Sequence, residues 1–222
     1  TKVNTVKDGN TLVLTDVNNI VSTSGSYAFN TVADLGAVYT SRVTANFVAS
    51  GFVQTDVIDS RTALVDTWAN WDGEPSDKVI ATLEIRTTNT DPTATPTWTP
   101  WQPLVIGDFQ ARAFQFRVSI TSSDSSRNIA ISDLSVTIDM PDRNEKAQNV
   151  NVPTSGLTVT YNNPFKAVPF LGITGQNMND HQYWTLSNET TDGFTIIIYD
   201  NNSNQHVSKN INWMATGYGR KV

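Results

Sequence analysis

Apolar and polar side chains alternate along this 222-residue chain with a period of two, and this pattern restricts its fold more than any other feature. In the clearest stretch, polar Gln115 and Arg117 separate Phe114, Phe116 and Val118. Successive side chains of a strand point to opposite faces of a sheet, so such a stretch predicts a strand with one buried face. No window of about 12 residues keeps apolar side chains at helical spacing. Comparable alternation occurs at residues 43–47, 81–86, 134–140, 157–161 and 194–198.

The composition favours the same fold class. Val, Ile and Thr together supply 66 residues, whereas the chain has only 10 Leu and 4 Glu. β-Branched side chains lose rotamer freedom in a helix but pack well on a pleated sheet. We therefore expect an all-β protein made of two antiparallel β-sandwich domains.

The charged segment from Met140 to Lys146 marks the expected domain boundary. A predicted strand ends there, Pro141 cannot donate to a sheet, and the alternation starts again at Val150. We place a larger domain at residues 1–142 and a smaller one at 147–222. Residues 89–103 are rich in Thr and Pro and predict a long exposed loop, and 200–205 predict a polar hairpin tip.

Charge and residue usage exclude several classes of protein. A net charge of −6 and a pI near 4.8 argue against a nucleic-acid partner, because duplex binding needs Lys and Arg at the phosphates. No apolar run is long enough to insert in a membrane, and no basic segment with an apolar core predicts a secretory signal. The chain has no Cys, which suits assembly in a reducing cytosol. Its 30 Thr, 22 Asn and 18 Ser predict a neutral surface of hydroxyls and amides.

No motif predicts an enzyme, a metal or a cofactor. The two histidines, His181 and His206, lack zinc-site spacing, and neither a Gly-x-Ser-x-Gly elbow nor a phosphate-binding glycine loop occurs. The oxygen-rich segments 72–74 and 200–202 lack a calcium-loop pattern, so we interpret them as turns. Paired carboxylates for glycoside hydrolysis stay open, because the chain has 17 Asp.

Aromatic residues beside amides and carboxylates are the candidates for sugar binding. An aromatic ring can stack on the C–H face of a pyranose, while Asp, Asn and His bond its hydroxyls. Each Trp also has a structural interpretation: we expect Trp213 in the core, and Trp68 and Trp71 in a structural role. The predicted glycan-binding residues are Trp184, Tyr183, His181 and Asp180 in one loop, and Trp98 and Trp101 in another.

The second half of the chain resembles a known family. The order of the segments 163–165, 168–174, 193–196 and 211–219 is similar to the carboxy-terminal domain of phage tail-tip host-specificity proteins and their fibre relatives. It also resembles the H-type lectin fold, a six-stranded antiparallel sandwich that forms trimers. In those lectins the sugar lies between subunits near a Trp, a His and a Tyr. Trp184, His181 and Tyr183 supply these residue types here in a different local order, whereas Gly217 to Gly219 are expected to close the fold.

The first half resembles the jelly-roll module that precedes such domains, through segments 34–36, 98–101, 112–117 and 131–141. The two resemblances together imply a virion component at the tail tip that acts outside the cell. They imply a homotrimer, contact with other tail proteins, and a bacterial surface polysaccharide or lipopolysaccharide as receptor. We thus expect a non-enzymatic receptor-binding domain; a trimerisation or tail-assembly module and a glycan depolymerase are the alternatives. Ile197 and Tyr199 are expected to pack against another subunit or the first domain.

Overall fold

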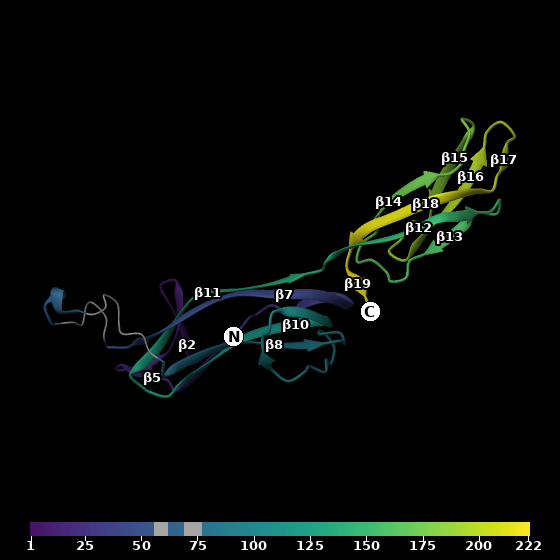
Figure 1. Ribbon diagram of the computed structural model, residues 1–222. Helices are drawn as coiled ribbons and strands as arrows, with labels where there is room; N and C mark the ends of the chain where they lie inside the picture. Colours follow the sequence, from purple (N-terminus) through teal and green to yellow (C-terminus); the bar gives the residue numbers. More distant parts are fainter. Residues whose placement is uncertain (56–61, 69–76) are drawn as a thin grey trace. The chain divides into compact units, whose positions relative to one another are not determined.

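The computed structural model describes residues 1–55, 62–68 and 77–222, which consist mostly of β-strands (Figure 1). These residues contain no α-helix and one 3₁₀ turn, η2 (Val65–Thr67). The pairs with a defined register are antiparallel, from the short hairpins to the long central strands. The predicted all-β class with antiparallel sandwich-like sheets is confirmed.

The chain divides into two compact units. Unit 1 comprises Thr1–Gly36, Val43–Gly107 and Ala111–Ile138. Unit 2 comprises Ala37–Arg42, Asp108–Gln110 and Asp139–Val222. Each unit has a separate cluster of buried apolar side chains.

Unit 1 is built on one large curled sheet with the strand order β1-β6-β10-β7-β11-β3-β2. β8 lies on the other edge of β10 and carries the short β9, while β4 and β5 form a separate ribbon. The first 25 residues thus form several strands of this unit. The strands are β1 (Lys2–Val3), β2 (Thr5–Asp8), β3 (Thr11–Leu14), β4 (Asp16–Val17), β5 (Ile20–Val21), β6 (Ser24–Ala28), β7 (Ala33–Val53), β8 (Val79–Thr88), β9 (Gln102–Pro103), β10 (Gly107–Ser122) and β11 (Arg127–Asp139).

The core of unit 1 follows the predicted alternation. Phe114, Phe116 and Val118 of β10 are buried, and Gln115 and Arg117 between them are half-buried on the opposite face. Apolar residues of β8 and β11 complete the interior because they alternate in the same way. The central cluster consists of Leu14, Val21, Val79, Leu83, Val118, Ile120, Ile129 and Ile131.

Unit 2 contains two small antiparallel sheets. In one, β18 lies between β12 and β14, as Figure 1 shows; in the other, β16 lies between β13 and β15, and β17 also pairs with β16. The strands of these two sheets are β12 (Asp142–Val152), β13 (Leu157–Thr160), β14 (Phe170–Gly175), β15 (Gln182–Ser187), β16 (Gly193–Asp200), β17 (Gln205–His206) and β18 (Lys209–Tyr218). The last strand, β19 (Arg220–Lys221), pairs instead with Tyr39 and Thr40 of β7.

Aromatic rings fill the interior of unit 2. Trp213 is only 8% exposed, as predicted for a core residue, and its ring centroid lies 5.6 Å from that of Phe194 and 5.9 Å from that of Tyr161. Tyr161 also meets the edge of Phe165 at 5.1 Å. Edge-to-face and tilted contacts of this kind add stability beyond the burial of area. Ile196 and Ile198 of β16 cover the rings from the other sheet.

The segment predicted as a charged boundary is a strand. Residues 142–147 form the first part of β12 and pair with β18, with a register shift after Ala147. Arg143 and Glu145 point to the same face as Ala147, which packs against the core, and are 17% and 11% exposed at their side chains. They form an ion pair, and the Arg143 guanidinium lies 3.7 Å from the Phe165 ring centroid. We expected the second domain to begin only at residue 147, but residues 142–146 belong to unit 2, where Arg143 and Glu145 pair with each other.

Candidate functional site

Trp98 and Trp101 pack on the outer face of β8 and β10. The Arg86 guanidinium lies 5.0 Å from the Trp98 ring centroid and 4.6 Å from that of Trp101. The Arg117 guanidinium lies 4.5 Å from the Trp101 centroid. Guanidinium groups stack favourably on aromatic faces. These four side chains form what we call the Trp–Arg ladder.

Hydrogen bonds fix the two arginines of the ladder. Arg117 Nε donates to Glu84 Oε2 at 2.6 Å, and Arg86 Nε donates to Gln115 Oε1 at 2.7 Å. Burial, and next the charge of Arg117, lower the pKa of Arg86. The Trp101 ring thus contacts two guanidinium groups that project from the same face of the sheet. The geometry gives the predicted binding residues Trp98 and Trp101 a clear role in holding the 89–101 loop on the sheet.

Tyr183 and Trp184 lie in β15 rather than in a loop, and this separates them. Trp184 is paired with buried Ile198, so it points to the core side, where its ring lies close to Gly175. Tyr183 is paired with Tyr199 and points to the outer face. Consecutive residues of a strand cannot share a face. The expectation that one loop presents both rings is therefore corrected, although Trp184 is still 38% exposed at the edge.

The outer face of the β15–β16–β17 sheet carries three rings in a row. The Tyr183 and Tyr199 ring centroids are 5.4 Å apart, and those of Tyr199 and His206 are 5.8 Å apart. Register explains the row, because Tyr199 of the central strand is opposite Tyr183 on one side and His206 on the other. We call Tyr183, Tyr199 and His206 the aromatic row. Tyr183 is 45% exposed.

Polar groups gather at the same end of this sheet. Asp200 Oδ2 accepts from Gln182 Nε2 at 2.8 Å, and Asp200 Oδ1 accepts from the backbone N–H groups of Asn202 and Ser203. The Gln182 bond, the backbone bonds and the nearby charge of His181 lower the pKa of Asp200 against a small opposing effect of burial. The Tyr199 hydroxyl bonds Asn204 Oδ1. The aromatic row therefore ends at a carboxylate and several amides.

The other two predicted residues, His181 and Asp180, are exposed in the turn before β15. His181 Nε2 lies 3.6 Å from Asp180 Oδ1, and the His181 carbonyl accepts from the N–H of Asn201. His181 is thus near the polar end of the aromatic row. Sequence reasoning did not assign Tyr199 and His206 to this site; pairing across the 200–205 hairpin tip was the signal that could have found them.

Within residues 1–55, 62–68 and 77–222, no group of three or more His, Asp or Glu side chains is arranged to hold a metal ion. The helical part of that same portion offers no segment of the length and apolar character required to cross a membrane. The segment 72–74, and Trp71 before it, lie outside the described residues. Trp68 donates from Nε1 to the Ala63 carbonyl at 3.1 Å, a bond that suits its predicted structural role.

Comparison of the chain with known protein families, with curated proteins and with solved structures finds no match.

Proposed function

We propose that this protein is a non-enzymatic receptor-binding domain of a phage tail, which attaches the virion to a bacterial surface glycan. The observation that carries the proposal is the aromatic row with Asp200, Gln182 and His181 at its end. Exposed rings beside fixed hydrogen-bonding groups suit a pyranose, which has an apolar C–H face and a rim of hydroxyls.

The organisation of the site favours binding without large rearrangement. Cross-strand pairing places Tyr199 between its two neighbours, and the hydrogen bonds of Asp200 hold the hairpin tip beside them. A site that is already ordered avoids part of the entropy cost of binding. A polysaccharide or lipopolysaccharide also presents many copies of one sugar, so weak sites on a homotrimer gain from multivalency.

The lectin-like interpretation of unit 2 draws support from its strand count per sheet. Apart from the two-residue β17, each sheet has three strands, as a six-stranded antiparallel sandwich requires. The proposal therefore includes the homotrimer, contacts with other tail proteins and a place on the virion tail tip.

A structural trimerisation module is the second candidate. It is favoured by the outer face of the β12–β18–β14 sheet, where Phe170 is 80%, Met214 47% and Tyr218 43% exposed. Their partners in the register place all three on one face, opposite the buried Trp213. An exposed apolar group of this kind is typical of a contact surface. In this case another part of the tail recognises the host.

Adsorption to host cells separates the two candidates. Under the receptor-binding proposal, Tyr183→Ala lowers adsorption at least about tenfold, because it removes an exposed ring of the row. Val105→Ser changes an exposed apolar residue of unit 1 outside both surfaces, and as the control it leaves adsorption unchanged. Equal adsorption by the Tyr183→Ala variant, with an unchanged circular dichroism spectrum, would favour the structural module. Release of reducing ends from purified host polysaccharide would instead support a depolymerase.

A further inference from the structure

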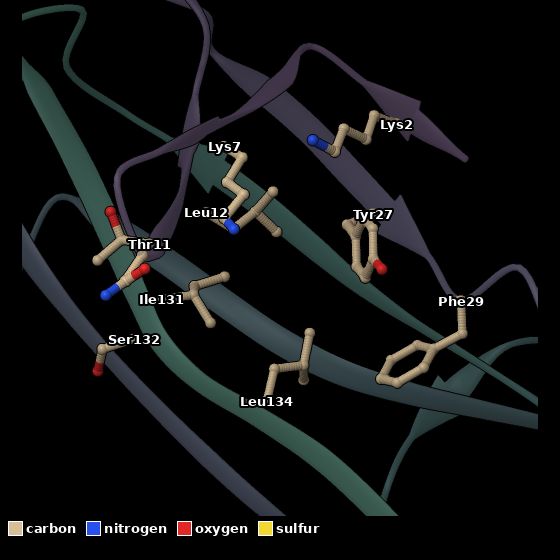
Figure 2. Close-up of a pocket in the computed structure, with 10 residues that line it drawn as sticks. Lys2, Lys7, Thr11, Leu12, Tyr27, Phe29, Ile131, Ser132 and Leu134 are labelled. Carbon is tan, nitrogen blue, oxygen red and sulfur yellow. The ribbon is translucent and has the colours of Figure 1, made fainter.

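Unit 1 contains a pocket of about 410 Å³ that the aromatic row does not involve. We call it the seam pocket. Figure 2 shows Lys7 beside Leu12, Lys2 on the same side as Tyr27, and Ile131 and Leu134 of β11 across from Tyr27 and Phe29. Its lining residues are Lys2, Lys7, Asn10, Thr11, Leu12, Tyr27, Phe29, Ile131, Ser132 and Leu134.

Strand register explains why lysines and apolar residues meet here. Lys7 of β2 is opposite Leu12 of β3, which is opposite Ile131 of β11. Residues directly opposite each other in antiparallel strands share a face. Since Ile131 is buried in the core, Lys7 also points to the interior side of the sheet.

A second row of side chains forms the opposite wall. Lys2 of β1 is opposite Tyr27 of β6, which is opposite buried Val118 of β10. Lys2 and Tyr27 therefore also point to the interior side. Both lysines thus extend along apolar surface while their ammonium groups reach the open mouth of the pocket.

The two walls come from opposite ends of one curled sheet. β1 and β2 are the first and last strands in the sheet order, yet only Asn4 separates them in the chain. Asn4 has a φ of 48°, and the Thr5 hydroxyl donates to the Ser26 carbonyl at 3.1 Å. A Cβ at Gly25 would lie 2.7 Å from the Asn4 carbonyl oxygen, so the crossing needs glycine there. The seam pocket is where the interior opens between these terminal strands.

The charge in the pocket is of one sign. No Asp or Glu lines it, and neither Lys2 nor Lys7 forms an ion pair with a described residue, although the chain has a net charge of −6. Asp8 follows Lys7 in β2 and so points to the other face. Asp133 lies between the lining residues Ser132 and Leu134, but it does not line the pocket, and its Oδ2 accepts a hydrogen bond from Asn46. Two ammonium groups above an apolar floor attract an anion.

The aromatic wall is held in place before any ligand arrives. The Phe29 ring centroid is 6.1 Å from that of buried Phe116, in an edge-on contact, and 5.8 Å from that of Tyr27. Thr11 and Ser132 add hydroxyl groups, and Asn10 adds an amide. The pocket thus combines cations, ring surface, aliphatic floor and neutral hydrogen-bonding groups.

We infer that the seam pocket binds a carboxylate-bearing sugar residue of an acidic saccharide. Lys2 and Lys7 pair with the carboxylate, Tyr27 and Phe29 contact the C–H face of the ring, and the small polar groups bond its hydroxyls. This site is separate from the aromatic row and does not depend on the function proposed for unit 2.

The competing explanation is protection of sheet edges. Inward-pointing lysines on terminal strands also prevent edge-to-edge association. Under that explanation the lysines suppress self-association and recognise no anion. The two explanations therefore differ in what happens when the charges are removed.

Titration of the full chain with trigalacturonate, followed by NMR and calorimetry, tests the inference. We expect saturable binding at low ionic strength that weakens strongly at high salt, and much weaker binding of the methyl-esterified trisaccharide. Equal binding of acid and ester, or no binding of trigalacturonate at millimolar concentration, overturns the inference. Binding of glucose 6-phosphate but not of trigalacturonate also overturns it, in favour of a phosphate ligand.

Variants complete the test. Lys2→Gln and Lys7→Gln are each expected to weaken trigalacturonate binding about tenfold or more, since each removes a charged hydrogen bond. Lys78→Gln removes the same charge from the same unit outside the pocket and should leave binding unchanged. If the pocket variants self-associate but bind trigalacturonate as tightly as the unmodified chain, the lysines only protect edges and the inference is wrong.

Discussion

At the scale of single residues, the inner face of β12 shows how a charge can be compatible with a core. Arg143 donates to the carbonyls of Gly219 and Asn163 as well as to Glu145, and Glu145 accepts from the N–H groups of Asn162 and Asn163. Burial alone raises the pKa of Glu145, but these hydrogen bonds outweigh it and hold the pKa below its usual range. Each charge is thus paired and also hydrogen-bonded to the backbone, as burial requires.

Breaking this ion pair on one side should be costly. We expect Arg143→Met to lower the free energy of unfolding by about 3–5 kcal/mol, because it leaves the Glu145 carboxylate buried without its cation. Because the pKa of Glu145 is lowered on folding, its contribution is present above its usual pKa and is lost as the pH falls below it. Urea denaturation at neutral and acid pH measures both effects.

The double variant Arg143→Met with Glu145→Leu is the control for this prediction. With both charges removed, most of the stability should return, because apolar residues of similar size replace a buried pair at little cost. A single variant as stable as the unmodified chain would show that the pair is solvated.

Tyr161 predicts an alkaline limit to stability. Burial, and next the charges of Glu189 and Glu145, raise the pKa of Tyr161 to about 12. The folded state therefore holds the phenolic proton more tightly than the unfolded state, whose tyrosine has a pKa near ~10. This contribution is fully present below the unfolded pKa and is lost as the pH rises through that of the folded state. We expect Tyr161→Phe to reduce the loss of stability above pH ~10, measured by denaturant unfolding; an unchanged slope would contradict this.

At the scale of elements, the close approach of β13 to β16 depends on a glycine. A Cβ at Gly193, the first residue of β16, would collide with the Val159 carbonyl of the paired strand β13. At Gly172 in β14, by contrast, a Cβ would meet only the Met214 carbonyl oxygen, at 3.8 Å. The strand contact therefore requires glycine at position 193, whereas position 172 has room for a larger residue.

The two glycines form a matched pair of tests. Gly193→Ala should destabilise the protein by about 1–3 kcal/mol, because the added methyl pushes β13 away from β16. Gly172→Ala should be neutral or stabilising by up to about 1 kcal/mol, because alanine loses less backbone entropy on folding. Thermal unfolding measured by circular dichroism distinguishes the two; equal losses would show that the Gly193 contact relaxes freely.

Ile197 and Tyr199 on the outer face of β16 were expected to pack against another subunit or the first domain. Ile197 and Tyr199 are half-buried within the chain, Ile197 next to Gly156 and Tyr199 in the aromatic row. Neighbouring strands thus supply part of the cover that we expected from another subunit or the first domain. The larger uncovered apolar group is on the opposite sheet, at Phe170 and Met214.

At the scale of the whole molecule, the property to be tested is the proposed association of three chains into a trimer. We expect sedimentation equilibrium to give a mass of about three chains of 24.4 kDa each. Phe170→Ser should shift that mass towards one chain, because it removes the most exposed apolar side chain of the β12–β18–β14 face. A stable single-chain mass for the unmodified protein would contradict the trimer.

The all-β class and most core positions were predictable because alternation is a local property. Phe114, Phe116, Ile196 and Ile198 are buried as their spacing indicates, since a strand has only two faces and the apolar one turns inward. The role predicted for Trp213 followed from the same pattern.

Only the tertiary structure decided which side chains meet. Arg143 and Glu145 become buried through pairing with β18, the rings of the aromatic row come from three strands, and Arg86 reaches Trp98 across a loop. The two lysines of the seam pocket converge because the ends of a curled sheet approach each other. Such contacts depend on the register between strands distant in the chain, and a register shift of one residue turns every side chain to the other face. Local spacing therefore determines which residues are buried, whereas pairing determines what surrounds them.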